Sequence, residues 1–170
     1  MSFDFRRILR AMRPITAADL MNPRVLTVRQ DLTVRELANV LVENEISGAP
    51  VEDRSGKLVG VVSLTDIAAA LAEDEEDLEG ERGDFFQSEW EDDGMSREEI
   101  EELGLDEAEL TVAEIMTPEV FTVREDTPVS EIAEAMIQNH VHRILVTRDD
   151  RVVGIISTSD LLGLLVEEKE

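Results

Sequence analysis

The chain has 170 residues, no cysteine and a formal net charge of −24, from 40 acidic and 16 basic side chains. These values exclude disulfides, thiolate metal sites and a catalytic thiol, and they argue against nucleic acid as a partner because no basic patch faces phosphates. No apolar run approaches the length of a membrane span, and the first residues lack the apolar stretch of a secretory signal. We therefore expect a cytoplasmic protein with no membrane partner.

Residues 1–14 begin the chain with a short amphipathic pattern. Apolar side chains recur at helical spacing among four arginines, and Pro14 ends the pattern. This spacing predicts a short basic helix that docks on its own subunit or on a second one. The apolar positions are Phe5, Ile8, Leu9 and Met12.

Residues 15–72 form a first α/β unit. Val25–Val28 is the first predicted strand, and Thr33-x-x-Glu36 is a capping box that predicts the start of a helix. Strands follow at 48–52 and 58–63, joined by a turn at 54–56, and a helix follows from about residue 65 to 71. The buried face of the first helix is predicted to be Val34, Leu37, Ala38 and Leu41.

Residues 73–110 interrupt this plan with an acidic insert. Residues 73–109 hold 19 of the 40 acidic side chains and only two arginines. Such charge runs repel themselves and predict loose order. A capping box at Ser96–Glu99 predicts a short helix ending near Leu103. The aromatic residues Phe85, Phe86 and Trp90 either pin the insert onto its own module or dock a partner.

Residues 111–170 repeat the plan of the first unit. Asp19–Pro23 matches Glu114–Pro118, and Gly60–Asp66 matches Gly154–Asp160. The offset is 95 residues at the start and 94 at the end, so the second copy is one residue shorter in a turn. Thr127 is the predicted cap of its first helix, with Pro128 as the first helical residue. Two copies of one unit predict pseudo-two-fold symmetry, with a cleft that occurs twice.

These paired motifs resemble those of CBS (cystathionine β-synthase) domains. The opening motifs Asp-Leu-Met-Asn-Pro and Glu-Ile-Met-Thr-Pro, and the closing motif Gly-apolar-apolar-Ser-x-x-Asp, each occur twice in order. The resemblance implies an α/β fold of tandem CBS repeats, each β-α-β-β-α, that form a Bateman module. It covers about residues 15–72 and 111–166, and leaves out the first helix and the insert.

The resemblance also implies two adenosine sites between the repeats. In this family the closing Asp accepts hydrogen bonds from both ribose hydroxyls, which suits a carboxylate. Carried over, a first site combines Ser63 and Asp66 with Thr122, Val123, His142 and Arg143. A second site combines Ser157 and Asp160 with Thr27, Val28, Ser47, Gly48, Ala49 and Pro50. We expect the first site to be the tighter one for a nucleotide, because Arg143 and His142 add positive charge there.

Other readings of these residues remain open. The two Ser–Asp pairs also suit helix caps, so the module could bind no ligand. His140 and His142 lack a third ligand and make a poor zinc site, and His140 fits a helix end. No nucleophile, general base or metal constellation is evident, so an enzyme is not expected.

We therefore expect a stand-alone regulatory CBS pair that binds AMP, ADP, ATP or S-adenosylmethionine and requires no cofactor. The resemblance implies a homodimer, and a change of conformation would signal to a protein partner. Two alternatives are a ligand-free dimeric scaffold that acts through the aromatic acidic insert, and a divalent-cation sensor that uses the same insert.

Overall fold

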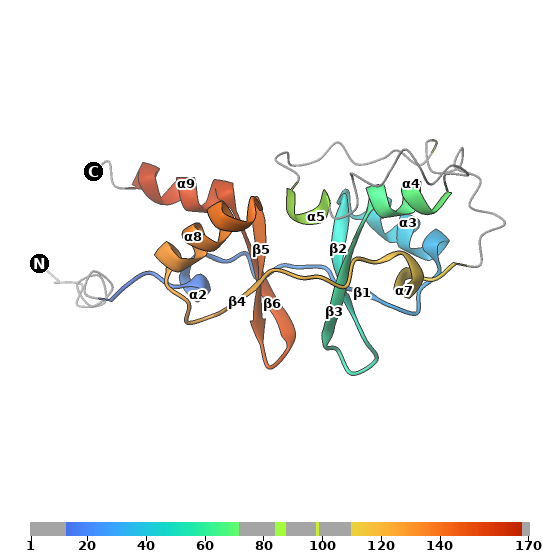
Figure 1. Ribbon diagram of the computed structural model, residues 1–170, viewed down its shortest axis with the longest axis horizontal. Coiled ribbons are helices and arrows are strands. Elements are labelled where there is room, and N and C mark those ends of the chain that lie inside the picture. The colour runs from blue at the N-terminus through green and yellow to red at the C-terminus, as the bar shows by residue number, and fades with distance from the viewer. Residues whose placement is uncertain (1–12, 72–83, 88–97, 99–109, 168–170) are drawn as a thin grey trace, which may run out of the picture.

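The computed structural model describes residues 13–71, 84–87, 98 and 110–167, and shows two similar halves side by side (Figure 1). Each half contains one three-stranded sheet, in the order β1-β2-β3 or β4-β5-β6. In both sheets the first pair of strands is parallel and the second pair is antiparallel. The predicted α/β fold with two repeats is confirmed.

The first half follows the predicted order of elements. Its elements are β1 (Val28–Arg29), α3 (Val34–Glu43), β2 (Gly48–Glu52), β3 (Leu58–Ser63) and α4 (Leu64–Leu71). The capping box of α3 is confirmed, since the Thr33 side chain accepts from the Glu36 N–H and the Glu36 carboxylate accepts from the Thr33 N–H. The four apolar residues predicted for its inner face are all buried.

The second half repeats this arrangement with β4 (Thr122–Arg124), α8 (Val129–Asn139), β5 (Arg143–Arg148), β6 (Arg151–Ser157) and α9 (Thr158–Glu167). The predicted cap of α8 is wrong by one residue. Pro128 is the N-cap, and the Thr127 hydroxyl instead accepts the Arg124 N–H in the preceding turn. His140 closes α8 in a left-handed conformation with φ of 53°, so its place at a helix end is confirmed.

The first strand is shorter than predicted and begins later. We expected Val25–Val28, but β1 holds only Val28 and Arg29, which pair with Val51 and Glu52. The preceding residues belong to a segment that crosses to the other half, where Asn22 pairs with Ile155. These residues therefore do not pair with β2.

Two short helices that we did not predict exchange between the halves. The helix α2 (Ala17–Leu20) lies beside the second half, where the Ala17 N–H donates to the Thr127 carbonyl at 2.9 Å (Figure 1). The helix α7 (Val112–Ile115) lies beside the first half, where the Val112 N–H donates to the Leu32 carbonyl at 2.8 Å. Each half is therefore completed by a segment that precedes the other half in the sequence.

Glycines of the closing motifs make room for the exchanged segments. A Cβ atom on Gly60 would lie 2.8 Å from the Thr117 carbonyl oxygen and 2.9 Å from the Met116 sulfur. At Gly154, a Cβ atom would meet the side chain of Met21. The opening motif of each repeat therefore packs directly on the closing motif of the other.

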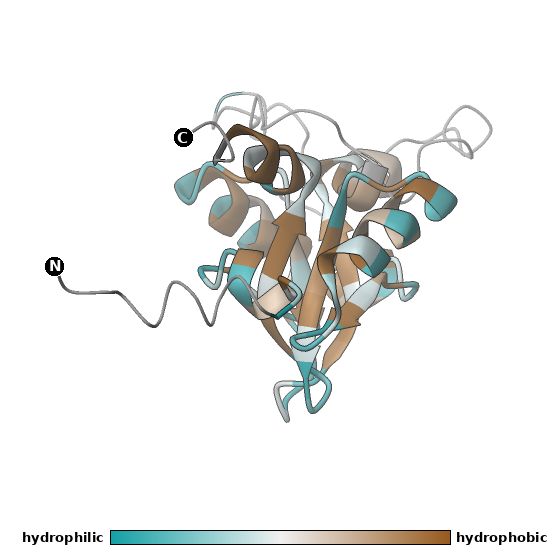
Figure 2. Cartoon of the chain, turned by 90° about the vertical axis from the view of Figure 1, so that its left-hand side faces the viewer, coloured by the Kyte–Doolittle hydropathy of each residue, from teal (hydrophilic) through white to brown (hydrophobic). Residues whose placement is uncertain are grey.

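The described residues form two apolar cores. One core gathers around α3 and β2 and includes Val112 of α7, and the other gathers around β5 and includes Ala17 of α2. Figure 2 shows the apolar residues concentrated on the strands. Full burial of side chains such as Leu37 and Leu41 stabilises the fold by about 1.5–3 kcal/mol each.

The insert contributes one short helix to the described residues, α5 (Asp84–Gln87). Phe85 and Phe86 are only 4% and 3% exposed and belong to the core of the second half. The prediction that these two aromatics pin the insert to its own module is confirmed. The predicted N-terminal helix, the helix after Ser96 and Trp90 fall outside the described residues. None of the helices in the described part of the chain has the length and apolar character needed to span a bilayer.

Candidate functional site

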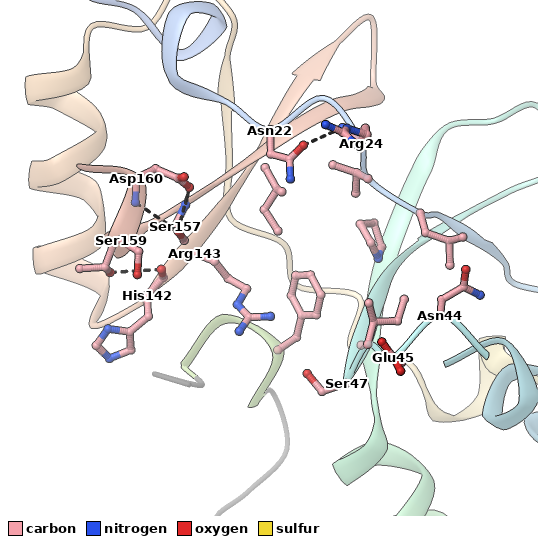
Figure 3. A pocket seen from close by; sticks show the side chains of 18 of the residues that line it. Asn22, Arg24, Asn44, Glu45, Ser47, His142, Arg143, Ser157, Ser159 and Asp160 are labelled. Carbon is pink, nitrogen blue, oxygen red and sulfur yellow. Dashed lines mark hydrogen bonds between the residues drawn. The ribbon is translucent and has the colours of Figure 1, made fainter. Parts of the chain in front are cut away.

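A pocket of about 860 Å³ lies between the two halves, near the start of α9. In Figure 3, Ser157, Ser159 and Asp160 lie on one side, and Asn44 and Ser47 lie on the other. The volume falls in the range of pockets that hold cofactor-sized ligands.

The pocket wall from the second half is built on a helix cap. The N–H and the hydroxyl of Ser157 both donate to Oδ2 of Asp160, each at 2.7 Å, and the Asp160 N–H donates back to the Ser157 hydroxyl at 3.3 Å. No hydrogen bond to Oδ1 of Asp160 is present among the described residues. The cap therefore fixes the carboxylate while one oxygen keeps its acceptor capacity.

The equivalent pair in the first half has the same cap but a different environment. Ser63 donates from its N–H and its hydroxyl to Oδ2 of Asp66, at 2.7 and 2.9 Å. Ser63 is 4% exposed and Asp66 is 5% exposed, whereas Ser157 and Asp160 are half-buried. Both Ser–Asp pairs do cap helices, and only the pair in the second half lines this pocket.

Most of the residues predicted for the second site are brought together. Five line the pocket, and three do not. Val28 and Ala49 are buried, and the Thr27 hydroxyl donates to the Glu52 carboxylate at 3.0 Å. The five that line it are Ser47, Gly48, Pro50, Ser157 and Asp160.

Of the six residues predicted for the first site, two line this pocket and four do not. His142 and Arg143 line the pocket beside Asp160. In its sheet Arg143 pairs with Ser157, as Gly48 pairs with Ser63 in the other half. Thr122 is exposed and Val123 is half-buried on β4, and neither lines the pocket.

The comparison of the two repeats did not predict several of the residues that line the pocket. Some lie in the crossing segment before β1, whose role depends on the exchange of α2. Phe85 comes from the insert, and no repeat pattern could have indicated it. The sequence could have indicated Thr158 and Ser159, because they are the two variable positions of the closing motif. The residues missed are Asn22, Arg24, Val25, Leu26, Asn44, Glu45, Ile46, Phe85, Ile155, Thr158, Ser159 and Leu162.

The pocket combines charged groups with an apolar wall. Arg24 and Arg143 contribute guanidinium groups, and Glu45 and Asp160 contribute carboxylates. The Arg143 side chain lies over the Phe85 ring, with its guanidinium carbon 5.4 Å from the ring centroid. Such a lining suits a ligand with a flat apolar part, hydroxyl donors and an anionic group.

No group of three or more His, Asp or Glu side chains that could hold a metal ion occurs within the described ranges. Most of the acidic insert lies outside those ranges.

A family model for the CBS domain matches residues 17–73 and 112–167 of this chain. The chain belongs to the CBS domain family. The two matched segments contain both Ser–Asp caps of this CBS pair and both exchanged helices.

Two curated relatives have the same sequence identity to this chain. L-aspartate semialdehyde sulfurtransferase of Methanocaldococcus jannaschii is 28% identical over 158 residues, a match that covers 92% of this chain and 24% of the relative. Protein MJ1426 of the same organism is 28% identical over 152 residues, with 87% of this chain and 89% of the relative covered. The chain thus spans about a quarter of the first relative and most of the second.

Solved structures of CBS pairs are also similar to this chain. The CBS domain of a CBS domain-containing membrane protein from Sphaerobacter thermophilus is 33% identical, with a TM-score of 0.64 and coverage of 94% and 93% of the two chains. The CBS pair of protein MJ0100, solved with 5′-methylthioadenosine and S-adenosyl-L-methionine, is 26% identical, with a TM-score of 0.62 and coverage of 92% and 100%. CBSX2, solved with AMP, is 25% identical, with a TM-score of 0.62 and coverage of 91% and 98%.

Proposed function

We propose that this CBS pair is a regulatory module that binds an adenosine-type ligand in the pocket beside Asp160. The observation that carries the proposal is the capped Asp160 carboxylate in a pocket lined by both halves. AMP, ADP, ATP and S-adenosylmethionine are the candidate ligands, and the AMP, S-adenosylmethionine and 5′-methylthioadenosine complexes of similar CBS pairs support this class.

Each part of such a ligand has a matching group in the pocket. The ribose hydroxyls donate to the Asp160 carboxylate, which the Ser157 cap holds in place. The adenine ring packs against apolar side chains such as Leu26, Ile46 and Pro50. The phosphate, or the charged tail of another adenosine ligand, extends toward the end of the pocket at Arg143.

Binding acts through the relative position of the halves rather than through chemistry. The ligand would contact residues from both halves at once, and it therefore stabilises the arrangement that brings those residues together. A partner protein recognises that arrangement of the two halves. The module itself catalyses no reaction.

We also propose that two copies associate through α8 and α9. Four large apolar side chains on these helices are exposed by 57–73%, and α9 is the largely apolar helix that leads to the C-terminus in Figure 2. Large apolar side chains this exposed are what an interaction surface buries. Sedimentation velocity tests this, since Leu165→Glu should convert a dimer to a monomer and a monomeric wild type contradicts the proposal. The four side chains are Ile137, Leu162, Leu165 and Val166.

Thermal melting of ligand-stripped protein tests ligand binding. Each candidate compound is added at about 1 mM, and a ligand at one hundred times its dissociation constant stabilises by about 2.7 kcal/mol, which raises the midpoint by several degrees. Asp160→Ala should remove the shift. Asp126→Asn, an exposed carboxylate change outside the pocket lining, is the control and should retain it. The proposal fails if no compound raises the midpoint, or if Asp160→Ala responds like wild type.

A further inference from the structure

We infer that α5 occupies the second possible ligand cleft, the one beside Asp66, so that each chain binds one adenosine-type ligand rather than two. The inference rests on the proposed function and concerns a segment that has no counterpart in the repeats. Four features of Phe85 and Phe86 carry it.

The position of α5 separates the two clefts. Figure 1 shows α5 between β3 and β5, at the ends of the central strands. Phe85 and Phe86 are buried there, and the Phe85 ring lies beside Gly48, which pairs with Ser63 at the end of β3. Ser63 and Asp66 are almost fully buried next to α5. Their equivalents Ser157 and Asp160, which line the pocket described above (the open pocket), are half-buried.

The Phe86 ring takes the place of an apolar ligand ring. It lies edge-to-face with Phe121, with ring centroids 5.2 Å apart and an interplanar angle of 87°. Phe121 is the repeat equivalent of Leu26, which lines the open pocket. The surface that would contact an adenine in the cleft of Asp66 is therefore already covered by a side chain of the same protein.

The Phe86 backbone also takes the place of a hydrogen-bond acceptor. Its carbonyl accepts the His142 N–H at 2.6 Å. The equivalent donor in the other repeat is the N–H of Ser47, a residue that lines the open pocket. Among the described residues, no group accepts a hydrogen bond from the Ser47 N–H. An adenine ring nitrogen is an acceptor of the kind that would satisfy it, so Phe86 supplies to His142 what a ligand would supply to Ser47.

Phe85 anchors α5 at the boundary between the clefts. A Cβ atom on Gly48 would lie 2.8 Å from Cδ2 of Phe85, and the Arg143 guanidinium lies on the same ring. Gly48 and Arg143 are equivalent positions of the two repeats. Because Gly48 has no side chain, the Phe85 ring fits directly against it. Arg143, at the equivalent position of the other half, contacts the same ring with its guanidinium group.

Isothermal titration calorimetry with AMP and with S-adenosylmethionine tests the stoichiometry. Wild type should bind one molecule per chain of whichever probe binds. Phe86→Ala should add a second site, and the double variant Phe86→Ala/Asp66→Ala should lose that site again. Met136→Ala is the matched control, because it removes a buried side chain of the same core and should leave one site. Circular dichroism verifies that each variant is folded.

The outcomes separate this inference from the proposed function. Two sites in wild type, or one site in a folded Phe86→Ala variant, overturns the inference and leaves the proposed function standing. If Phe86→Ala does not fold, Asp66→Asn decides. The inference requires unchanged affinity in that variant, and a loss of more than tenfold overturns it. If wild type binds neither probe while Phe86→Ala gains a site that depends on Asp66, the proposed function fails and the role of α5 stands. No binding by either protein overturns both.

Discussion

The Arg143 guanidinium carbon lies 5.4 Å from the centroid of the Phe85 ring. This contact joins β5 of the second half to the helix α5 of the insert, at a point where both residues line the open pocket. A cation held over an aromatic ring keeps its charge, so Arg143 can pack on Phe85 and still attract an anion. The insert therefore forms part of the wall of this pocket.

Replacing Arg143 with Gln should distinguish charged from uncharged ligands. A hydrogen bond to a charged group contributes about 1.5–3 kcal/mol, so AMP should bind about 10- to 150-fold more weakly. Adenosine, which has no phosphate, should lose less than threefold. Calorimetry of both ligands measures this, with the exposed Arg124→Gln as the control. Equal losses for AMP and adenosine would contradict a phosphate-binding role.

Gly60→Ala should destabilise the fold. The added Cβ would press on the Thr117 backbone and on Met116, and overpacking of this kind costs about 1–3 kcal/mol. Urea unfolding measures the free energy. Gly163→Ala in α9 is the control, because nothing lies within 4 Å of its added Cβ and Ala favours a helix by about 0.5–1 kcal/mol. A neutral Gly60→Ala would show that the exchanged segments pack less closely than described.

Asp19 should contribute to stability above about pH 4 and lose that contribution in acid. Hydrogen bonds from Arg13, and then from the Thr16 N–H, lower the pKa of Asp19 to about 2. Because the folded pKa lies below the unfolded value of about 3.9, the stabilisation is present above that value and disappears as the pH falls toward 2. We expect about 1 kcal/mol after screening by solvent.

The measurement is urea unfolding of wild type and Asp19→Asn between pH 7 and pH 2. The difference in free energy should be largest near neutral pH and should shrink as the pH falls below 4. Arg13→Gln should reproduce part of the effect, since Arg13 is the larger cause of the shift. A difference that stays constant with pH would contradict the assignment.

Thr33→Ala should remove the cap of α3. The lost acceptor leaves the Glu36 N–H without its hydrogen bond, which costs about 1 kcal/mol. Thr33→Ser retains the hydroxyl and should cost much less. Thermal melting compares the two variants, and equal effects would show that the methyl group rather than the cap stabilises this position.

Local patterns explain why so much of the fold was predictable. The capping box at Thr33 and Glu36 and the buried face of α3 depend only on residues within three turns of one another. The strands at 48–52 and 58–63 and the turn between them depend on a short antiparallel pairing. The duplicated closing motif then predicted both Ser–Asp caps, because the same local sequence makes the same hydrogen bonds twice.

Contacts across long sequence separations explain what was not predictable. Arg143 lines the pocket beside Asp160 together with Phe85 of α5, a neighbour that the comparison of the two repeats could not indicate. The exchange of α2 and α7 depends on cores that form only when both halves are present.

The amino-acid sequence alone determined the family, the order of the strands and longer helices in each repeat, and the two capped carboxylates, because these follow from local hydrogen bonding and from a motif that occurs twice. Only the tertiary structure decided which residues surround each carboxylate and how Phe85 and Phe86 are placed between the halves. Two nearly identical motifs acquire different surroundings because α5 belongs to neither repeat. Its packing breaks the symmetry that the repeated sequence would otherwise impose.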